Sequence, residues 1–179
     1  ITPYFVKMTN KALTLPLSII FNKSFQTSKF PKLWKIANII PIYKKGDKNN
    51  INNYRPISIL NVFSKVLERC IHPILKSYCM KFINIEQHGF CVKKSTVSNL
   101  LSYTSYLTNN VDKGYQVDSI YTDFSSAFDK VNHILLIKKL ESYGIHGSLL
   151  RWLQSYLVNR IQKGHCPWSD FRSLSLASS

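Results

Sequence analysis

Apolar residues recur at intervals of three and four along much of the chain, which is the spacing of an amphipathic α-helix. The longest such stretch predicts a helix from Asn61 to about Phe82, with a kink near Pro73 because proline cannot donate the helical hydrogen bond. Its apolar positions are Phe63, Val66, Leu67, Cys70, Ile71, Ile74, Leu75 and Tyr78. We expect the face that they form to belong to the core.

The same spacing, together with start and stop signals, predicts four further helices. Thr14 is predicted to cap the first of them, which has Pro16 in its first turn and ends before Phe30. Another is predicted to begin at Ser95. The segments "HILLIKKLESYG" and "GSLLRWLQSYLVNR" predict two more helices separated by glycines, and we expect Trp152 in the second to be buried.

Two stretches have the composition of β-strands. "IANIIPIY", residues 36–43, is mostly apolar and predicts a strand with an edge or a bulge at Pro41. A polar, turn-rich loop, "KKGDKNNINNYRP", follows it. Residues 119–122 predict a buried strand that ends at Asp123. Strands interleaved with helices predict an α/β or α+β fold.

The charge of the chain narrows the class of partner. Among 179 residues, 24 Lys and Arg oppose 9 Asp and Glu, which gives a net charge of +15. A nucleic acid is the first partner that this excess indicates, an anionic membrane surface is the second, and a basic surface without a partner is the third reading. No stretch is apolar enough for a transmembrane helix. The four cysteines have no CxxC spacing, so we expect reduced, buried thiols in an intracellular protein.

Asp123 has the local sequence of a metal or phosphate site. A carboxylate is costly to bury without a cation, and Mg²⁺ prefers carboxylate oxygens. The small residues Ser125, Ser126 and Ala127 leave their backbone N–H groups free to approach an anion. An aspartate at the end of a strand is also common in turns and as a helix cap, and this reading stays open for Asp123 on its own.

The wider context resembles a known family. "YTDFSSAFDKVNH" is similar to the first catalytic motif of reverse transcriptases from non-LTR (LINE-like) retrotransposons, and "GFCVKKSTVSNLL" and "FPKLWKIANIIPIYKKGDKNNINNYRPIS" resemble other blocks of that family, closest to its jockey-like branch. The resemblance implies the right-hand polymerase fold, incomplete here, with fingers and the first part of the palm. It implies an N-terminal helical extension over residues 1–30, fingers over 31–115 and a partial palm over 116–179.

The resemblance also implies roles for the residues of the Asp123 motif. Asp123 is expected to bind two catalytic Mg²⁺ ions, for which Mn²⁺ is a possible substitute, with help from the carbonyl of Phe124. The backbone N–H groups of Ser126 and Ala127 are expected to meet the triphosphate of a dNTP. Phe128 is expected to lie under the sugar and to exclude a 2′-hydroxyl. Here Ser126 stands where the family has Lys, so no basic contact is expected there.

Basic residues of the turn-rich loop are candidates for binding the same triphosphate. Arg55 carries a guanidinium fork that suits phosphate oxygens, and Pro56 stiffens the backbone after it. Lys44 and Lys45 are candidates for the phosphates or the template, with a solvated loop as the alternative.

A second basic segment is a candidate for contact with the RNA template and DNA primer. A predicted helix N-terminus there offers free N–H groups to an anion, although an ordinary capped helix has the same sequence signature. The residues are Lys93, Lys94, Ser95 and Thr96.

The expected function is therefore that of a fragment of an RNA-directed DNA polymerase. Two-metal phosphoryl transfer needs several acidic ligands, and no Asp-Asp pair occurs in these 179 residues, so we expect no activity from the fragment alone. Both ends resemble cuts through a longer chain. A non-catalytic, basic nucleic-acid-binding remnant of a decayed retroelement is the alternative. We expect an intracellular protein, nuclear or cytoplasmic rather than secreted, with no membrane partner and an oligomeric state that the sequence leaves open.

Overall fold

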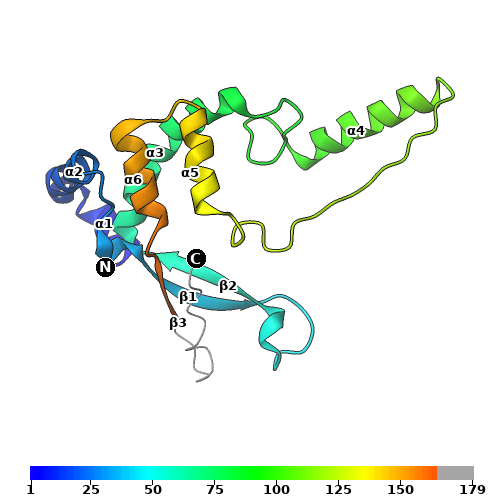
Figure 1. The fold of residues 1–179 in the computed structure, drawn as a ribbon. Coiled ribbons are helices and arrows are strands. Elements are labelled where there is room, and N and C mark those ends of the chain that lie inside the picture. Colours follow the sequence, from blue (N-terminus) through cyan, green and yellow to red (C-terminus); the bar gives the residue numbers. More distant parts are fainter. Residues whose placement is uncertain (165–179) are drawn as a thin grey trace. The chain divides into compact units, whose positions relative to one another are not determined.

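The computed structural model describes residues 1–164, which divide into two compact units (Figure 1). The first unit contains residues 1–75 and, of the described residues, 132–164. The second contains residues 76–131. The fold mixes helices with a small sheet, as the sequence predicts. The last part of the residue range predicted as palm, together with Cys166, lies outside the described residues.

The N-terminal helices of the first unit are α1 (Pro3–Met8) and α2 (Asn10–Gln26). The predicted start at Thr14 is wrong, because Thr14 lies inside α2, where its hydroxyl donates to the carbonyl of Asn10 at 2.8 Å. Pro16 is likewise internal. The helix extends further because Leu13 continues the row of apolar residues, four apart, that α2 turns toward the rest of the unit. This row outweighs the helical hydrogen bond that Pro16 cannot make.

The sheet has three strands in the order β2-β1-β3. A 3-10 turn, η1 (Lys32–Lys35), leads into β1 (Ile36–Tyr43), which confirms the strand predicted for residues 36–43. β1 pairs antiparallel with β2 (Tyr54–Leu60) and parallel with β3 (Ile161–Gly164). The loop between β1 and β2 contains the short η2 (Ile51–Asn53). The predicted loop is therefore too long at its end, because Tyr54 already pairs with Tyr43.

Two prolines face each other across the β1–β2 ladder. Pro41 pairs with Pro56, and no residue is inserted in the register on either side of them, so β1 has no bulge there. The N–H of Lys44 donates to the carbonyl of Asn53 at 2.8 Å, and bonded pairs alternate along an antiparallel ladder. The Pro41–Pro56 pair is therefore a non-bonded pair, and neither proline removes a bond between β1 and β2. Within the described residues, β3 pairs with residues 36–39 of β1, and the position of Pro41 relative to the edge of the sheet stays a prediction.

The core of the first unit is aromatic. α3 (Val62–Cys79) and α6 (Gly147–Leu157) contribute Leu67 and Trp152, and the segment before β1 contributes Phe30 and Trp34. The ring of Trp152 lies 4.9 Å from that of Phe25 and 5.4 Å from that of Phe30, measured between centroids. The predicted burial of Trp152 is confirmed. α5 (His133–Ser142) precedes α6, as the pattern predicts.

Two buried polar side chains of this unit are hydrogen-bonded. The hydroxyl of Ser24 donates to the carbonyl of Lys29 at 2.6 Å and accepts from the indole N–H of Trp152 at 2.8 Å. The ammonium of Lys35 donates to the carbonyl of Val158, just after the last turn of α6, at 3.0 Å. Burial, and then the positive charges of Arg160 and Lys32, lower the pKa of Lys35.

The helix predicted from Asn61 to Phe82 is confirmed as α3 followed by the 3-10 turn η3 (Met80–Phe82), with Pro73 inside α3. The cysteines on α3 are free thiols, but the expectation that they are buried is wrong for Cys70, which is exposed, and Cys79 is half-buried. The reason is that α3 is fully covered only at Ser64 and Leu67.

In the second unit, α4 (Thr96–Val111) begins as predicted, with Ser95 as its cap. The strand predicted for residues 119–122 is wrong, because these residues form no regular structure and Ile120 is 90% exposed. A strand needs a paired neighbour, and none of the described residues supplies one to this segment. Across residues 1–164, no helix combines the length and apolar character needed to span a membrane.

Candidate functional site

Arg55, near the start of β2, and Lys44 and Lys45, just after β1, lie close to one end of the hairpin. Arg55 pairs with Ile42 across the ladder, and Lys44 follows β1, where its N–H still bonds to β2. Because side chains alternate between the two faces of a strand, Lys44 lies on the same face as Ile42 and Arg55. The structure therefore brings two of the three predicted phosphate ligands to one face.

The turn of this hairpin is closed by hydrogen bonds. The hydroxyl of Tyr43 donates to the carbonyl of Gly46 at 2.5 Å, and the amide of Asn53 donates to the carbonyl of Asp47 at 2.8 Å. Gly46 has a φ of +91°, a conformation that glycine adopts without strain. A Cβ at this position would lie 2.7 Å from Nδ2 of Asn53. The turn that carries the lysines is thus fixed by a glycine.

The face that carries Arg55 also has an apolar surface, which the sequence analysis missed. Four isoleucines lie on this face, each between 41% and 51% exposed, in the pair that contains Arg55 and in the two same-face pairs that follow it along β2. They are Ile40, Ile42, Ile57 and Ile59. The alternation of apolar residues in β1 and β2 is the signal that indicates it, once β2 is recognised as a strand. An apolar surface beside a guanidinium suits a ligand with a flat ring and an anionic group.

The segment that leads to Asp123 is tied to α4 through tyrosines. The hydroxyl of Tyr103, on α4, donates to Oγ of Ser119 at 2.5 Å, and the hydroxyl of Tyr121 donates to that of Tyr103 at 2.8 Å. These bonds lower the pKa of Tyr103 and raise that of Tyr121. Tyr103 therefore fixes the chain two residues before Asp123, a role that the sequence analysis did not find.

A turn follows Asp123 and exposes the rest of the motif. Ser126 has a φ of +56°, and its carbonyl accepts from the N–H groups of Asp129 and Lys130 at 3.1 and 3.2 Å. Among residues 1–164, nothing accepts a hydrogen bond from the N–H groups of Ser126 and Ala127. Phe128 is 82% exposed. The turn thus offers backbone donors and an aromatic side chain on the surface.

The donor set around Asp123 falls short of a metal centre. No group of three or more His, Cys, Asp or Glu side chains that could hold a metal occurs in the part of the chain that the structure describes. Mg²⁺ takes six oxygen ligands, whereas the sequence predicts only two at this turn, the carboxylate of Asp123 and the carbonyl of Phe124. Asp129 does not cap α5. The side chain of Asn132 does so by accepting a hydrogen bond from the N–H of Leu135.

The basic segment before α4 is largely engaged in local contacts. The ammonium of Lys94 donates to the carbonyl of Ile85. The hydroxyl of Ser95 accepts from the N–H of Ser98 at 3.1 Å, and that of Ser98 accepts from the N–H of Ser95 at 2.8 Å. Lys93 and Thr96 are exposed. The capped-helix alternative therefore accounts for Lys94 and Ser95, and Lys93 is the exposed cation of the group.

The predicted site residues fall into both units. Arg55 and the two lysines of the hairpin belong to the first, whereas the Asp123 motif and the segment before α4 belong to the second. The structure accordingly supports two local arrangements, a basic and apolar hairpin and an acidic turn with free backbone donors.

Comparison with known proteins identifies the family. Residues 42–173 match the family described as reverse transcriptase (RNA-dependent DNA polymerase), and the chain therefore belongs to this family. The match includes the hairpin lysines, Arg55 and the Asp123 motif. The family membership predicted from "YTDFSSAFDKVNH" is confirmed.

The relatives come from non-LTR transposons. The chain is 31% identical over 169 residues to the probable RNA-directed DNA polymerase from transposon BS of Drosophila melanogaster, which covers 86% of this chain and 19% of that protein. It is 34% identical over 149 residues to the RNA-directed DNA polymerase from mobile element jockey of Drosophila funebris, covering 82% of this chain and 16% of that protein. The chain spans about a fifth or less of the length of these relatives.

Proposed function

We propose that the chain forms the fingers and the first part of the palm of an RNA-directed DNA polymerase, which extends a DNA primer with dNTPs on an RNA template. The family match over residues 42–173 carries this proposal. The subdomains are an N-terminal helical extension (1–30), fingers (31–115) and a partial palm (116–179). Such a protein acts where its template is, in the nucleus or the cytoplasm.

The hairpin is proposed to bind the incoming nucleotide. The guanidinium of Arg55 supplies two parallel N–H donors for phosphate oxygens, and Lys44 adds a positive charge on the same face. Lys45 extends the charge toward the template. The exposed isoleucines beside Arg55 give the base or sugar of a nucleotide an apolar surface.

The Asp123 turn is proposed to hold the reacting end of the nucleotide. Asp123 and the carbonyl of Phe124 would be ligands of divalent cations, Mg²⁺ or Mn²⁺, which neutralise the charge that develops on the phosphates. The N–H groups of Ser126 and Ala127, which have no acceptor within residues 1–164, donate to phosphate oxygens. The exposed ring of Phe128 blocks the position of a ribose 2′-hydroxyl.

The segment before α4 is proposed to contact the template–primer. Lys93 is exposed and Thr96 opens the helix, so both are accessible to phosphate groups. Lys94 and Ser95 orient this segment through their contacts with Ile85 and Ser98. The two oxygen ligands at Asp123 do not complete a metal site, and the remaining ligands have to come from other residues, so the fragment alone is proposed to be inactive.

The test compares Asp123→Ala with Asp129→Ala in a full-length protein that contains this segment. Both carboxylates are exposed and six residues apart, so both variants should fold, as circular dichroism would verify. Asp123→Ala should abolish primer extension while leaving the affinity for template–primer within about twofold, because the loss is one of catalysis. Asp129→Ala should retain extension. Normal extension by Asp123→Ala would remove this residue from the site.

The second candidate function is that of a non-catalytic nucleic-acid binder, and the lack of a group of three or more metal-binding side chains among the described residues favours it. The charge of +15 then acts alone, and affinity for single strands and hybrid duplexes should fall steeply between about 50 and 200 mM salt. Both candidates share this salt dependence. Primer extension by the full-length protein separates them, since a binder without catalysis would show none.

A further inference from the structure

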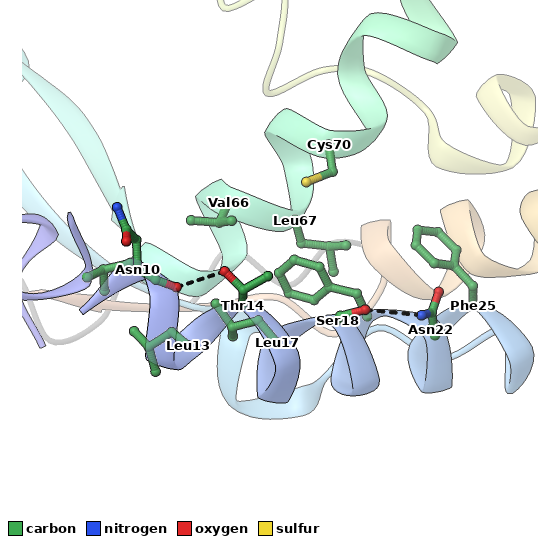
Figure 2. Close-up of a pocket in the computed structure, with 12 residues that line it drawn as sticks. Asn10, Leu13, Thr14, Leu17, Ser18, Asn22, Phe25, Val66, Leu67 and Cys70 are labelled. Carbon is green, nitrogen blue, oxygen red and sulfur yellow. Dashed lines mark hydrogen bonds between the residues drawn. The ribbon is translucent and has the colours of Figure 1, made fainter. Parts of the chain in front are cut away.

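A groove runs between α2 and α3 in the first unit, away from every residue assigned a role above (Figure 2). Its volume is about 440 Å³. Leu13, Leu17, Phe21 and Phe25 line it from α2, and none of them is fully buried. Leucine and phenylalanine side chains left half-buried in a row are an incomplete helix–helix contact, and a further element would complete it.

A second row of small polar residues runs along the same side of α2. Asn10, Thr14, Ser18 and Asn22 also line the groove, four positions apart, and all are exposed. Thr14 donates to the carbonyl of Asn10, and the amide of Asn22 donates to Oγ of Ser18 at 3.4 Å, so these groups satisfy one another along the helix. Short side chains with local hydrogen bonds let another backbone approach closely without burying an unpaired polar group.

The groove is elongated, which suits a helix better than a compact small molecule. Its lining runs from Asn10 to Phe25 along α2, a distance of about 22 Å at 1.5 Å per residue. That length corresponds to four turns of a helix, and the row spacing of four fits the ridges of a helix packed alongside. Val66, Leu67 and Cys70 of α3 form the facing wall (Figure 2).

The charged residues near the groove indicate the sign of charge that an occupant would carry. No aspartate or glutamate precedes Asp47 in the chain, so α1 and α2 carry only positive charge. Lys7 and Lys11 adjoin groove-lining residues of α1 and α2 in the sequence, and Lys65 and Arg69 adjoin those of α3, all exposed. Glu68 adjoins Leu67, but its carboxylate accepts hydrogen bonds from the hydroxyls of Ser64 and Tyr156. The charge beside the groove is therefore mainly positive, which disfavours a cationic occupant and favours acidic flanks.

We propose that this groove is a docking site for an amphipathic helix of a protein partner, with an apolar ridge at i, i+3, i+4 and i+7 and acidic residues on both flanks. The ridge inserts between α2 and α3 over Leu17 and Phe21, and the acidic flanks lie beside the lysines and Arg69. This is the helix-in-groove mode of recognition. It does not depend on the polymerase function, because none of its residues belongs to the nucleotide or template sites.

The probe is a designed 18-residue peptide with leucines on one helical face and glutamates beside them, carrying a fluorophore for anisotropy. Two peptides serve as comparisons. One has lysine in place of glutamate, and the other has the same composition as the acidic peptide in an order that destroys the apolar face. The acidic amphipathic peptide should bind the 179-residue chain at least about tenfold more tightly than either, a preference that net charge alone cannot produce.

Matched variants locate the binding. Ser18→Trp fills the groove from an exposed position, whereas Ala12→Trp adds the same bulk to α2 at an exposed position outside the lining. Ser18→Trp should weaken binding of the acidic peptide about tenfold, and Ala12→Trp should leave it unchanged. Circular dichroism should show both variants folded. Equal affinities of the two variants, or equal binding of the reordered peptide, would overturn the proposal.

Cys70 supplies an independent readout inside the groove. It is an exposed free thiol on the lining, whereas Cys79 and Cys91 lie outside it. Bound peptide should slow the alkylation of Cys70 by iodoacetamide and leave the alkylation rates of Cys79 and Cys91 unchanged. Mass spectrometry measures these rates. Protection of Cys70 by a single-stranded oligonucleotide and not by the peptide would assign the groove to nucleic acid and refute the proposal.

Discussion

Ser24 is expected to stabilise the first unit through the two hydrogen bonds of its hydroxyl, and Ser24→Ala tests this. The hydroxyl is 95% buried, donates to the carbonyl of Lys29 and accepts from the indole N–H of Trp152. Its removal leaves the buried indole N–H without an acceptor, which costs about 1–3 kcal/mol, and the carbonyl of Lys29 loses a donor at a cost of about 1 kcal/mol. Alanine regains about 0.5 kcal/mol of helix propensity. The expected net loss is about 2–3 kcal/mol.

The assay is urea unfolding followed by circular dichroism, with Ser18→Ala as the control. Ser18 lies on the same helix but is exposed, so its replacement measures the gain in helix propensity together with the loss of one long, exposed hydrogen bond from Asn22. Ser24→Ala should lower the midpoint by about 1 M urea, and Ser18→Ala should change it little. A loss below about 0.5 kcal/mol relative to Ser18→Ala would refute the reasoning.

Repeating Ser24→Ala in a Trp152→Phe variant shows how much of the lost stability comes from the indole hydrogen bond. Trp152→Phe removes the N–H group that Ser24 accepts from, while keeping an aromatic ring in the core. In that background, Ser24→Ala should cost only about 0.5 kcal/mol, because about 1 kcal/mol lost at the Lys29 carbonyl is offset by about 0.5 kcal/mol of helix propensity. The same cost in both backgrounds would show that the indole hydrogen bond contributes nothing.

Two further predictions concern the hairpin and the buried lysine. In urea unfolding, Gly46→Ala should lower the free energy of unfolding by about 1 kcal/mol or more beyond the loss caused by Gly114→Ala. Both glycines have positive φ, but only at Gly46 would a Cβ lie against Asn53. Equal losses in the two variants would contradict this. In the folded chain the pKa of Lys35 lies below 10.5, its value in the unfolded chain. Between these two values the unfolded chain binds more protons than the folded chain, so the free energy of unfolding should rise with pH up to about 10.5. Lys35→Met should reduce that rise, and an unchanged slope in alkaline unfolding curves would count against it.

The elements that sequence predicts well are those whose signal is local. β1, α3 and α6 have apolar periodicities long enough to define a partly buried face, and α4, which has no buried residue, is marked by its cap at Ser95. The predicted start of α2 is wrong because Pro16 is a strong local signal for a first turn, whereas the half-buried Leu13 lines the same groove as Val66 and Leu67, which are distant in sequence. β2 fails for a similar reason, since its pairing with β1 begins amid turn-forming residues.

The same difference between local signals and long-range contacts applies to the candidate site. The residues of the Asp123 motif were found because a motif is contiguous, and their chemistry follows from residue type. Tyr103 was missed because its link to Ser119 and Tyr121 joins residues 16 and 18 positions apart on the surface, without any periodic pattern. The strand predicted before Asp123 was wrong because a strand depends on a partner, and pattern alone does not state whether one is present.

The facing prolines of the hairpin have a consequence for how the protein behaves at high concentration. In a non-bonded pair, the backbone nitrogen of each residue points away from the partner strand, so the nitrogen of Pro56 points to the side of β2 opposite β1. Within residues 1–164, no strand pairs with that side of β2. A strand added there from another molecule would find no N–H donor at Pro56, and its ladder would be interrupted. Pro56 therefore makes edge-to-edge pairing through β2 less favourable, on a hairpin that exposes four isoleucines.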